Sequence, residues 1–397
     1  MLQPQIADRN ISIFYFVESC RSMVFMIPVW IAFLQTRISV SEIAIYVSVS
    51  FFTQLVLELP TGALADMIGK RKTIALAYFV DSIQYLLFGF AWLFPQFMVL
   101  AVISGLGEAL RSGSLEAMVY DSLKQDKKEG LFQKVMAKQG TRFQIGLVIS
   151  TILGGFMASR WTQLPYVTSG IFLMVAALVS LHMVEPIIDS DKFTLRNYLR
   201  QIKWGTIEAF KTVSHRYMSL YYIAVGAITW MCATYFNDYI LIDLGFVAEH
   251  RGVIAGALRL INVALIYKLL TNENIFNFRR TIWFFPILMV GALLPGWWLS
   301  GEWGIPFVGM AMMASTARWI LLGKYTNAAF ESKYRATAIS TLSMAIGVVY
   351  VITIPLSGLV MARWGDTRLI YTLLGALSLL IIPPLAYKVL NNNDYEK

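Results

Sequence analysis

The sequence has few cysteines, few histidines and little charge. Only two of its 397 residues are cysteine and three are histidine, and 14% are Asp, Glu, Lys or Arg. Cys20 and Cys232 both fall inside apolar runs, so we expect no disulfide between them. The histidines His182, His215 and His250 are too far apart in sequence to predict a metal site. No Gly-x-x-x-x-Gly-Lys-Ser/Thr phosphate loop and no pairing of a nucleophile with a base is evident. We therefore expect neither an enzyme nor a cofactor.

Apolar residues dominate what is present. They make up 57% of the chain, which is more than a soluble domain can hide, because a single core stops growing at roughly 250–300 residues. Apolar runs of about 20 residues are typical of helices that cross a lipid bilayer. We predict an all-α membrane protein with twelve transmembrane helices, at residues 11–35, 40–61, 73–94, 96–120, 139–160, 165–185, 217–241, 249–271, 280–300, 303–324, 334–361 and 367–389.

The net charge of +9 would suggest a nucleic-acid partner in a soluble protein. Here the bases cluster in alternate loops between the predicted helices. If both termini are cytoplasmic, 23 of the 33 Lys and Arg residues fall on the inner side and five on the outer side. Because positive residues mark cytoplasmic loops, this bias predicts cytoplasmic termini and no nucleic-acid partner.

One long polar segment, residues 186–216, separates six predicted helices from six. It contains either an amphipathic helix on the inner membrane surface or a solvated linker. We therefore divide the chain into an N-terminal bundle at 1–185, a cytoplasmic linker at 186–216 and a C-terminal bundle at 217–397. The two halves repeat one pattern with the same offset: Gly155, Arg160 and Trp161 correspond to Gly358, Arg363 and Trp364. Such a repeat predicts two pseudo-symmetric bundles with a substrate site between them.

These features resemble the major facilitator superfamily of secondary transporters over essentially the whole chain. The family's signature between helices 2 and 3 is Gly-x-Leu-Ala-Asp-Arg-x-Gly-Arg-Lys. This sequence reads Gly62-Ala-Leu-Ala-Asp66-Met67-Ile-Gly69-Lys70-Arg71, with Met67 where Arg is usual. The segments Gly105–Asp121 and Arg335–Ser340 resemble bacterial exporters of this superfamily. The helix 5 antiporter pattern keeps Gly146, Gly154 and Gly155 but lacks its Gly-Pro.

Ionisable residues inside predicted membrane helices are the main site candidates. Each costs at least about 2.5–3.5 kcal/mol to insert, so it usually faces a partner or a wet cavity. The resemblance implies that helices 1, 4, 7 and 10 line a central cavity. We predict that six charged residues line it, or else form fixed ion pairs: Glu18, Arg21, Glu108, Arg111, Arg259 and Arg318. Glu108 is the candidate for a proton switch, since burial favours the neutral form of a carboxyl group.

Aromatic residues on the same helices are further candidates. Trp30, Trp230, Tyr235 and Trp319 either stack on a substrate or pack in the protein interior. The resemblance also implies a gate that holds the halves together when the transporter is open outward. Asp66 would form it with the partial positive charge at the start of helix 11. The predicted gating residues are Gly62, Asp66, Gly69, Lys70, Arg71, Glu116, Asp121 and Arg142.

The resemblance implies a transporter that works by alternating access and draws on an ion gradient. The leading interpretation is proton-coupled export of a small amphipathic drug-like compound or metabolite by a monomer in a bacterial or archaeal plasma membrane. Its partners would be the small-molecule substrate, protons or another ion, and the lipid bilayer. The alternatives are uptake of a small organic anion and lipid flipping. A membrane receptor or enzyme without transport should show a soluble domain or a catalytic constellation, and we see neither.

Overall fold

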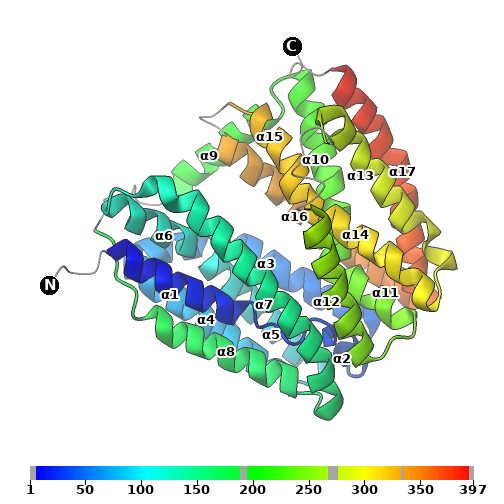
Figure 1. Cartoon of the computed structure of the whole chain (residues 1–397), viewed down its shortest axis with the longest axis horizontal. Helices are drawn as coiled ribbons and strands as arrows, with labels where there is room; N and C mark the ends of the chain where they lie inside the picture. The colour runs from blue at the N-terminus through cyan, green and yellow to red at the C-terminus, as the bar shows by residue number, and fades with distance from the viewer. Residues whose placement is uncertain (1–5, 188–194, 267–275, 332–334, 393–397) are drawn as a thin grey trace. The chain divides into compact units, whose positions relative to one another are not determined.

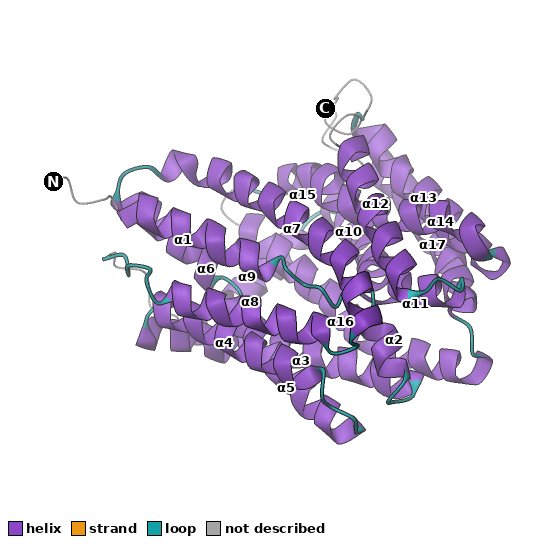
Figure 2. Ribbon diagram, turned by 60° about the horizontal axis from the view of Figure 1, so that its bottom comes forward, coloured by secondary structure: helices purple, strands orange, loops and turns teal. Residues whose placement is uncertain are grey.

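The computed structural model describes residues 6–187, 195–266, 276–331 and 335–392. All regular structure in these ranges is helical, without a strand (Figure 2). Eight helical segments there are long and apolar enough to cross a membrane: Val40–Glu58, Phe94–Gln125, Glu129–Arg160, Val213–Asp243, Phe278–Trp298, Gly301–Ala329, Thr337–Trp364 and Thr367–Asn391. A shorter apolar helix spans Leu164–Ser180. The prediction of an all-α membrane protein is confirmed.

The chain forms two compact units. Unit 1 comprises Met1–Ile38, Tyr46–Leu195 and Ala248–Gly256, and unit 2 comprises the rest. The helices that lie wholly in unit 1 are α1 (Ile6–Arg21), α2 (Trp30–Gln35), α4 (Lys70–Phe88), α5 (Phe94–Arg111), α6 (Ser114–Gln125), η1 (Glu129–Leu131), α7 (Phe132–Arg160) and α8 (Leu164–Ser180) (Figure 1).

Two helices are divided between the units, and the remaining described helices lie in unit 2, apart from Leu195 at the start of α9. The shared helices are α3 (Val40–Ile68) and α12 (Ala248–Leu265). The unit 2 helices are α9 (Leu195–Ala209), α10 (Val213–Met231), η2 (Cys232–Phe236), α11 (Asn237–Asp243), α13 (Phe278–Leu293), η4 (Leu294–Trp298), η5 (Gly301–Gly304), α14 (Ile305–Ala317), η6 (Arg318–Leu322), α15 (Gly323–Ala329), α16 (Arg335–Trp364) and α17 (Thr367–Asn391).

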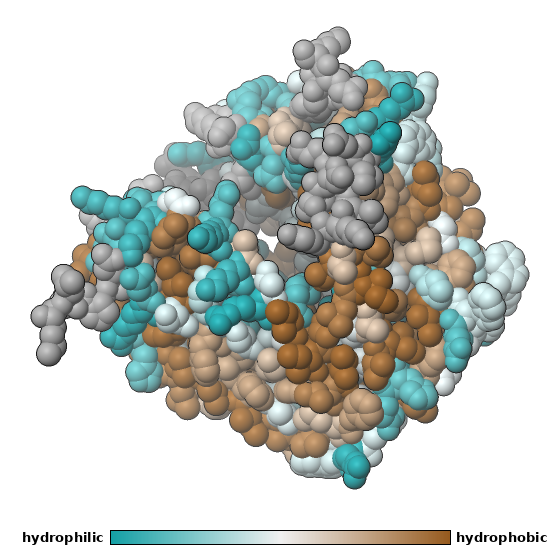
Figure 3. Space-filling model, viewed as in Figure 1, coloured by the Kyte–Doolittle hydropathy of each residue, from teal (hydrophilic) through white to brown (hydrophobic). Residues whose placement is uncertain are grey.

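The surface of unit 1 has an apolar part and a hydrophilic part, which lie at different positions along its helices. Figure 3 shows apolar residues gathered over α7 and α8, and hydrophilic residues near the start of α1 and α7. The exposed apolar side chains on these helices include Ile145, Ile149, Leu153, Phe156, Ile171, Val175 and Leu178. An apolar band of this kind is what a bilayer requires of the helices that face it.

The repeat glycines that the sequence singled out have matching environments. In unit 1, a Cβ at Gly155 of α7 would lie 2.4 Å from the carbonyl oxygen of Ala248, at the start of α12. In unit 2, a Cβ at Gly358 of α16 would lie 2.5 Å from Cβ of Ala44, near the start of α3. Each unit therefore packs the beginning of a shared helix against a glycine that allows close approach.

Several predicted helices differ from the observed ones. The segment predicted as a helix at 11–35 is broken into α1 and α2, and that predicted at 96–120 is broken at Ser112–Gly113 between α5 and α6. Conversely, α3 continues past the predicted end at residue 61 to Ile68, so that Gly69 alone separates it from α4. Pro60 removes one backbone hydrogen bond without ending the helix. The end predicted for helix 249–271 lies outside the described residues.

The polar segment after unit 1's last helix contains α9. Gly205 of α9 packs closely on α16, since a Cβ there would lie 2.6 Å from the carbonyl oxygen of Thr337. Glu208 is buried and accepts a hydrogen bond from the backbone N–H of Glu331 at 3.0 Å. This helix is therefore fastened to unit 2 rather than forming a solvated linker throughout.

Candidate functional site

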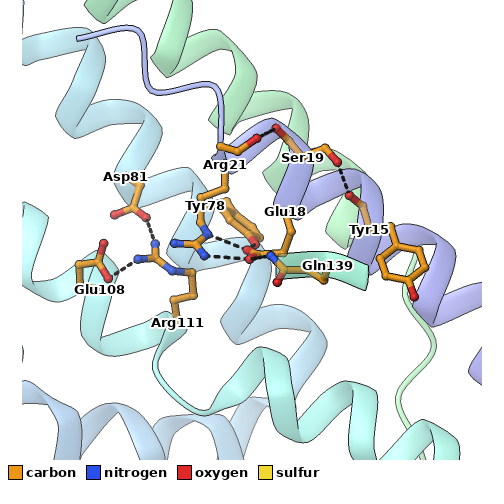
Figure 4. A network of polar contacts seen from close by, with 10 residues as sticks. Tyr15, Glu18, Ser19, Arg21, Tyr78, Asp81, Glu108, Arg111 and Gln139 are labelled. Carbon is orange, nitrogen blue, oxygen red and sulfur yellow. Dashed lines mark hydrogen bonds and ion pairs between the residues drawn. The ribbon is translucent and has the colours of Figure 1, made fainter. Parts of the chain in front are cut away.

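A network of buried charges lies in unit 1 where α1, α4, α5 and α7 meet (Figure 4). Arg21 donates two hydrogen bonds to Glu18, one turn earlier on α1, at 2.7 and 2.8 Å. The Glu18 carboxylate also accepts hydrogen bonds from the Tyr78 hydroxyl at 2.9 Å and the Gln139 amide at 2.7 Å. Four donors on three helices thus hold one buried carboxylate in place, which keeps a charge tolerable in an apolar interior.

The second part of the network centres on Arg111 at the end of α5. Its Nη1 donates to Asp81 of α4 at 2.6 Å, and its Nη2 forms an ion pair with Glu108. Figure 4 shows the Arg111 guanidinium between the two carboxylates. The side chains of Asp81 and Arg111 are about nine-tenths buried, whereas 46% of the Glu108 side chain is exposed. The Arg111 guanidinium therefore binds two carboxylates, the buried one of Asp81 and the partly exposed one of Glu108.

The network lines two cavities. The larger has a volume of about 390 Å³ and is lined by residues that include Glu18, Arg21, Glu108, Arg111, Glu116 and Gln139. The smaller has a volume of about 150 Å³, and its lining residues include Arg21, Asp81, Tyr85, Glu108, Arg111 and Phe143. Across both cavities, four carboxylates face two guanidinium groups, so the walls in unit 1 carry excess negative charge. The exposed side of Glu108 opens onto this space.

The break between α1 and α2 brings irregular backbone next to Arg21. Gly146 and Gly154 of α7 allow this backbone to approach, since a Cβ would lie 1.9 Å from Ser22 Oγ or 1.8 Å from the Phe25 carbonyl oxygen. Ser150 donates to the Ser22 carbonyl at 3.0 Å. In return, the Phe25 N–H donates to Ser169 Oγ at 3.0 Å. Non-helical backbone at membrane depth requires such partners, and here α7 and α8 supply them.

The turn between α3 and α4 is tied to the rest of unit 1 by two carboxylates. Gly69 has a φ of 91°, which favours glycine. Glu185, which follows α8, accepts hydrogen bonds from the N–H groups of Lys70 and Arg71 at 2.7 and 2.9 Å. The Lys70 ammonium forms an ion pair with Asp121 of α6. The turn is thus a capped helix start held on two sides.

The other predicted gating residues lie apart from this turn. Glu116 lines the larger cavity. Arg142 lies over the ring of Tyr15 at 5.0 Å. Gly62 and Asp66 lie in the last two turns of α3. The structure thus brings together Gly69, Lys70, Arg71 and Asp121 but places Glu116 and Arg142 elsewhere in unit 1, and a gating role for the set stays a prediction.

Unit 2 holds the remaining candidates. Arg318 is 1% exposed and begins the π-helical turn η6, with its guanidinium 4.2 Å from the ring centre of Trp319. The rings of Trp230 and Trp319 lie 6.5 Å apart. Tyr235 is fully buried against Phe236 and Tyr239. Arg259 is half-buried on α12, and Trp30 of unit 1 begins α2 without lining either cavity described above.

The residues predicted for the site left out three that the structure places in the network: Asp81, Tyr78 and Gln139. Asp81 could have been found, because an acid inside an apolar membrane segment calls for a buried partner. The polar residues Tyr78 and Gln139 carry no such signal. They are recognised only when the fold brings their helices against Glu18.

Apolar helices long enough to cross a bilayer, with buried, paired charges beside cavities of about 390 and 150 Å³, are typical of multi-pass membrane transporters. The model of the Major Facilitator Superfamily matches residues 11–314, and the chain belongs to this family. It is a multi-pass membrane transporter rather than an enzyme.

Among characterised and uncharacterised relatives, the chain is 22% identical to the uncharacterised MFS-type transporter YxaM of Bacillus subtilis, over 96% of this chain and 97% of that protein. It is 22% identical to the quinolone resistance protein NorA of Staphylococcus aureus over 171 residues, 41% of this chain and 42% of NorA. The fold is similar to that of the nucleoside transporter NupG, with a TM-score of 0.75 and 11% identity over 99% of this chain and all of that one.

Proposed function

We propose that this protein is a secondary active transporter that exports a small amphipathic molecule in exchange for protons, by alternating access. The observation that carries this proposal is the pairing of Asp81 and Glu108 on the single guanidinium of Arg111, at the wall of a polar cavity. Membrane-embedded charges are costly and commonly mark ion pathways.

The charge balance supports a role in proton binding. Arg111 can neutralise one of its two carboxylates, so the group carries one excess negative charge. A proton on Glu108 would cancel that charge and leave the Arg111–Asp81 pair intact. Because Glu108 is the carboxylate exposed to the cavity, it is the one that a proton can reach. Glu18 would keep its charge, since its carboxylate already accepts four hydrogen bonds.

The direction of transport is inferred from the relatives. NorA is named for resistance to quinolones, and its partial similarity to this chain favours export. The alternative of organic-anion uptake rested on four arginines, of which Arg21 and Arg111 are paired with acids within unit 1. A lipid flippase is the third candidate. The substrate of a flippase would differ from an exported amphipathic molecule and from an organic anion because it carries two long acyl chains.

For the membrane arrangement we propose twelve spans in two six-helix bundles, with both termini cytoplasmic. The bundles would be 1–185 and 217–397, joined by the cytoplasmic segment 186–216. The distribution of Lys and Arg supports this orientation. The protein would act as a monomer in a bacterial or archaeal plasma membrane, and bacterial relatives such as YxaM support this location.

The turn that contains Gly69 is the proposed gate element. Its pairing with Asp121 and Glu185 gives α4 a fixed start, from which Asp66 on α3 could engage a partner in one state and release it in another. Replacement of Asp66 by Asn with normal expression and normal transport would reject this role.

Accumulation of dyes in cells tests the proposed function. Cells that overproduce the protein would be incubated with ethidium, Nile red or fluorescein, which are cationic, neutral and anionic. We expect lower accumulation of at least one dye than in cells with an empty vector, and recovery when a protonophore collapses the gradient. Higher accumulation of fluorescein would support uptake instead. If each of the three dyes accumulated to the same level as in cells with an empty vector, both export and uptake would be contradicted.

A further inference from the structure

Among the residues that the structure describes, no acid forms an ion pair with the buried guanidinium of Arg318 in unit 2. The residue is 1% exposed, and its Nε and Nη1 atoms make no hydrogen bond to any residue that the structure describes. Its neighbours are aromatic: the ring centres of Trp319, Tyr222 and Trp230 lie 4.2, 5.7 and 5.8 Å from the guanidinium carbon.

The contrast with unit 1 is direct. There, Arg21 and Arg111 each pair with at least one carboxylate. A buried charge without a partner is strongly unfavourable, and aromatic rings recover only a small part of that cost. We therefore expect a buried, unpaired guanidinium to be retained only if a bound molecule pairs with it during transport.

The surrounding backbone is built to hold this side chain. Gly226 of α10 leaves room for it, because a Cβ there would lie 2.7 Å from Arg318 Nη1. Arg318 also begins a π-helical turn, and a second such turn, η2, lies on the segment that carries Trp230. Single π-helical turns are uncommon and occur frequently at functional sites. Trp319, the nearest ring, is 55% exposed, so the aromatic group around the guanidinium extends to the surface of the protein.

We propose that Arg318, with Tyr222, Trp230 and Trp319, binds the anionic group of an aromatic substrate. The unpaired N–H groups donate to carboxylate or sulfonate oxygens, and the rings stack on the flat apolar part of the molecule. This inference rests on the proposed transport function and deepens it, because it assigns the substrate class: small aromatic anions. Unit 1 then supplies the acidic, proton-binding network and unit 2 supplies the cation for the substrate.

Thermal unfolding of the purified full-length protein in detergent tests the assignment. The probes are 2-naphthoate, 2-naphthol and 2-naphthylmethylamine, which share one ring system and differ in charge. We expect 2-naphthoate to raise the unfolding temperature in a concentration-dependent way, and the other two to have little effect. Arg318→Gln should weaken the binding of 2-naphthoate at least about 10-fold, as expected for loss of a charge-assisted hydrogen bond.

A matched control is Arg363→Gln, because Arg363 also lies over a tryptophan ring, that of Trp364, but is exposed. This control should bind 2-naphthoate like the wild type. Equal stabilisation by all three probes, or unchanged binding of 2-naphthoate by Arg318→Gln, would overturn the proposal.

A second variant keeps the test decisive if Arg318→Gln folds poorly. Arg318→Met removes an unpaired buried charge and keeps an apolar side chain of similar length, so it should unfold at a higher temperature than the wild type without ligand. It should also lose the response to 2-naphthoate. A lower unfolding temperature would show that Arg318 has a structural role and would overturn the proposal. Because binding is measured without a proton gradient, retained binding with no transport would reject only the proposed function.

Discussion

Asp81 on α4 and Arg111 on α5 form an ion pair in which Oδ2 and Nη1 lie 2.6 Å apart and both side chains are about nine-tenths buried. The pair lies directly behind Glu108, which shares the same guanidinium. In the proposed mechanism Asp81 anchors Arg111, and Glu108 is the carboxylate that takes up the proton.

Removal of the anchor should destabilise the protein. Asp81→Ala leaves a buried guanidinium with one fewer partner, and we expect a loss of about 3 kcal/mol in the free energy of unfolding. Denaturant unfolding in detergent measures it. Asp8→Ala is the control, because Asp8 forms an exposed pair with Lys128 at 3.3 Å that should be worth at most about 1 kcal/mol. Equal effects of the two substitutions would contradict the assigned role of Asp81.

Replacing two different glycines of α7 by alanine should change the stability of the protein in opposite directions. Gly154→Ala would place a Cβ 1.8 Å from the Phe25 carbonyl oxygen, so the break between α1 and α2 must shift, at a cost of about 1–3 kcal/mol. Gly140→Ala has open space around it and should stabilise the helix by up to about 1 kcal/mol. The unfolding temperatures of the two variants should therefore move in opposite directions. Movement in the same direction would reject the close contact.

The helix cap supplied by Glu185 can be tested locally. Glu185→Ala removes the acceptor for the N–H groups of Lys70 and Arg71, and we expect a loss of about 1 kcal/mol. Hydrogen exchange at the first turn of α4 should accelerate, while exchange in α8 should not. The exposed Glu129 on η1 provides the control, since its replacement by Ala should leave α4 unchanged. Unaltered exchange in Glu185→Ala would show that the cap is not formed in solution.

Much of the fold could be predicted because helices that cross a bilayer are recognised in a sequence by their length and hydropathy. The apolar runs identified an all-α membrane protein, and the motif around Asp66 identified the family. The helix breaks could not be predicted in the same way. The run 11–35 is interrupted where glycines and hydroxyl groups of α7 and α8, distant in sequence, contact the backbone of Ser22 and Phe25. The run 96–120 is interrupted at Gly113, whose φ is 76°.

The candidate site was predicted unevenly for a related reason. Glu18 and Arg21 are one turn apart on one helix, so their pairing follows from helical geometry alone. The same holds for Glu108 and Arg111. Asp81 comes from a different helix, and its place beside Arg111 depends on how α4 packs against α5. Local pairs are readable from sequence, whereas pairs between helices require the fold.

The most direct test of the account is proton movement coupled to transport in proteoliposomes. Wild-type protein and Glu108→Gln would be reconstituted with the dye whose accumulation the protein lowers most in cells, and an internal pH indicator would follow protons. We predict that acid on the side that corresponds to the cell exterior drives dye movement and proton flux in the wild type. Glu108→Gln should still exchange dye, but without proton flux and without a response to the pH gradient. The same proton flux and pH response in Glu108→Gln as in the wild type would contradict the central claim.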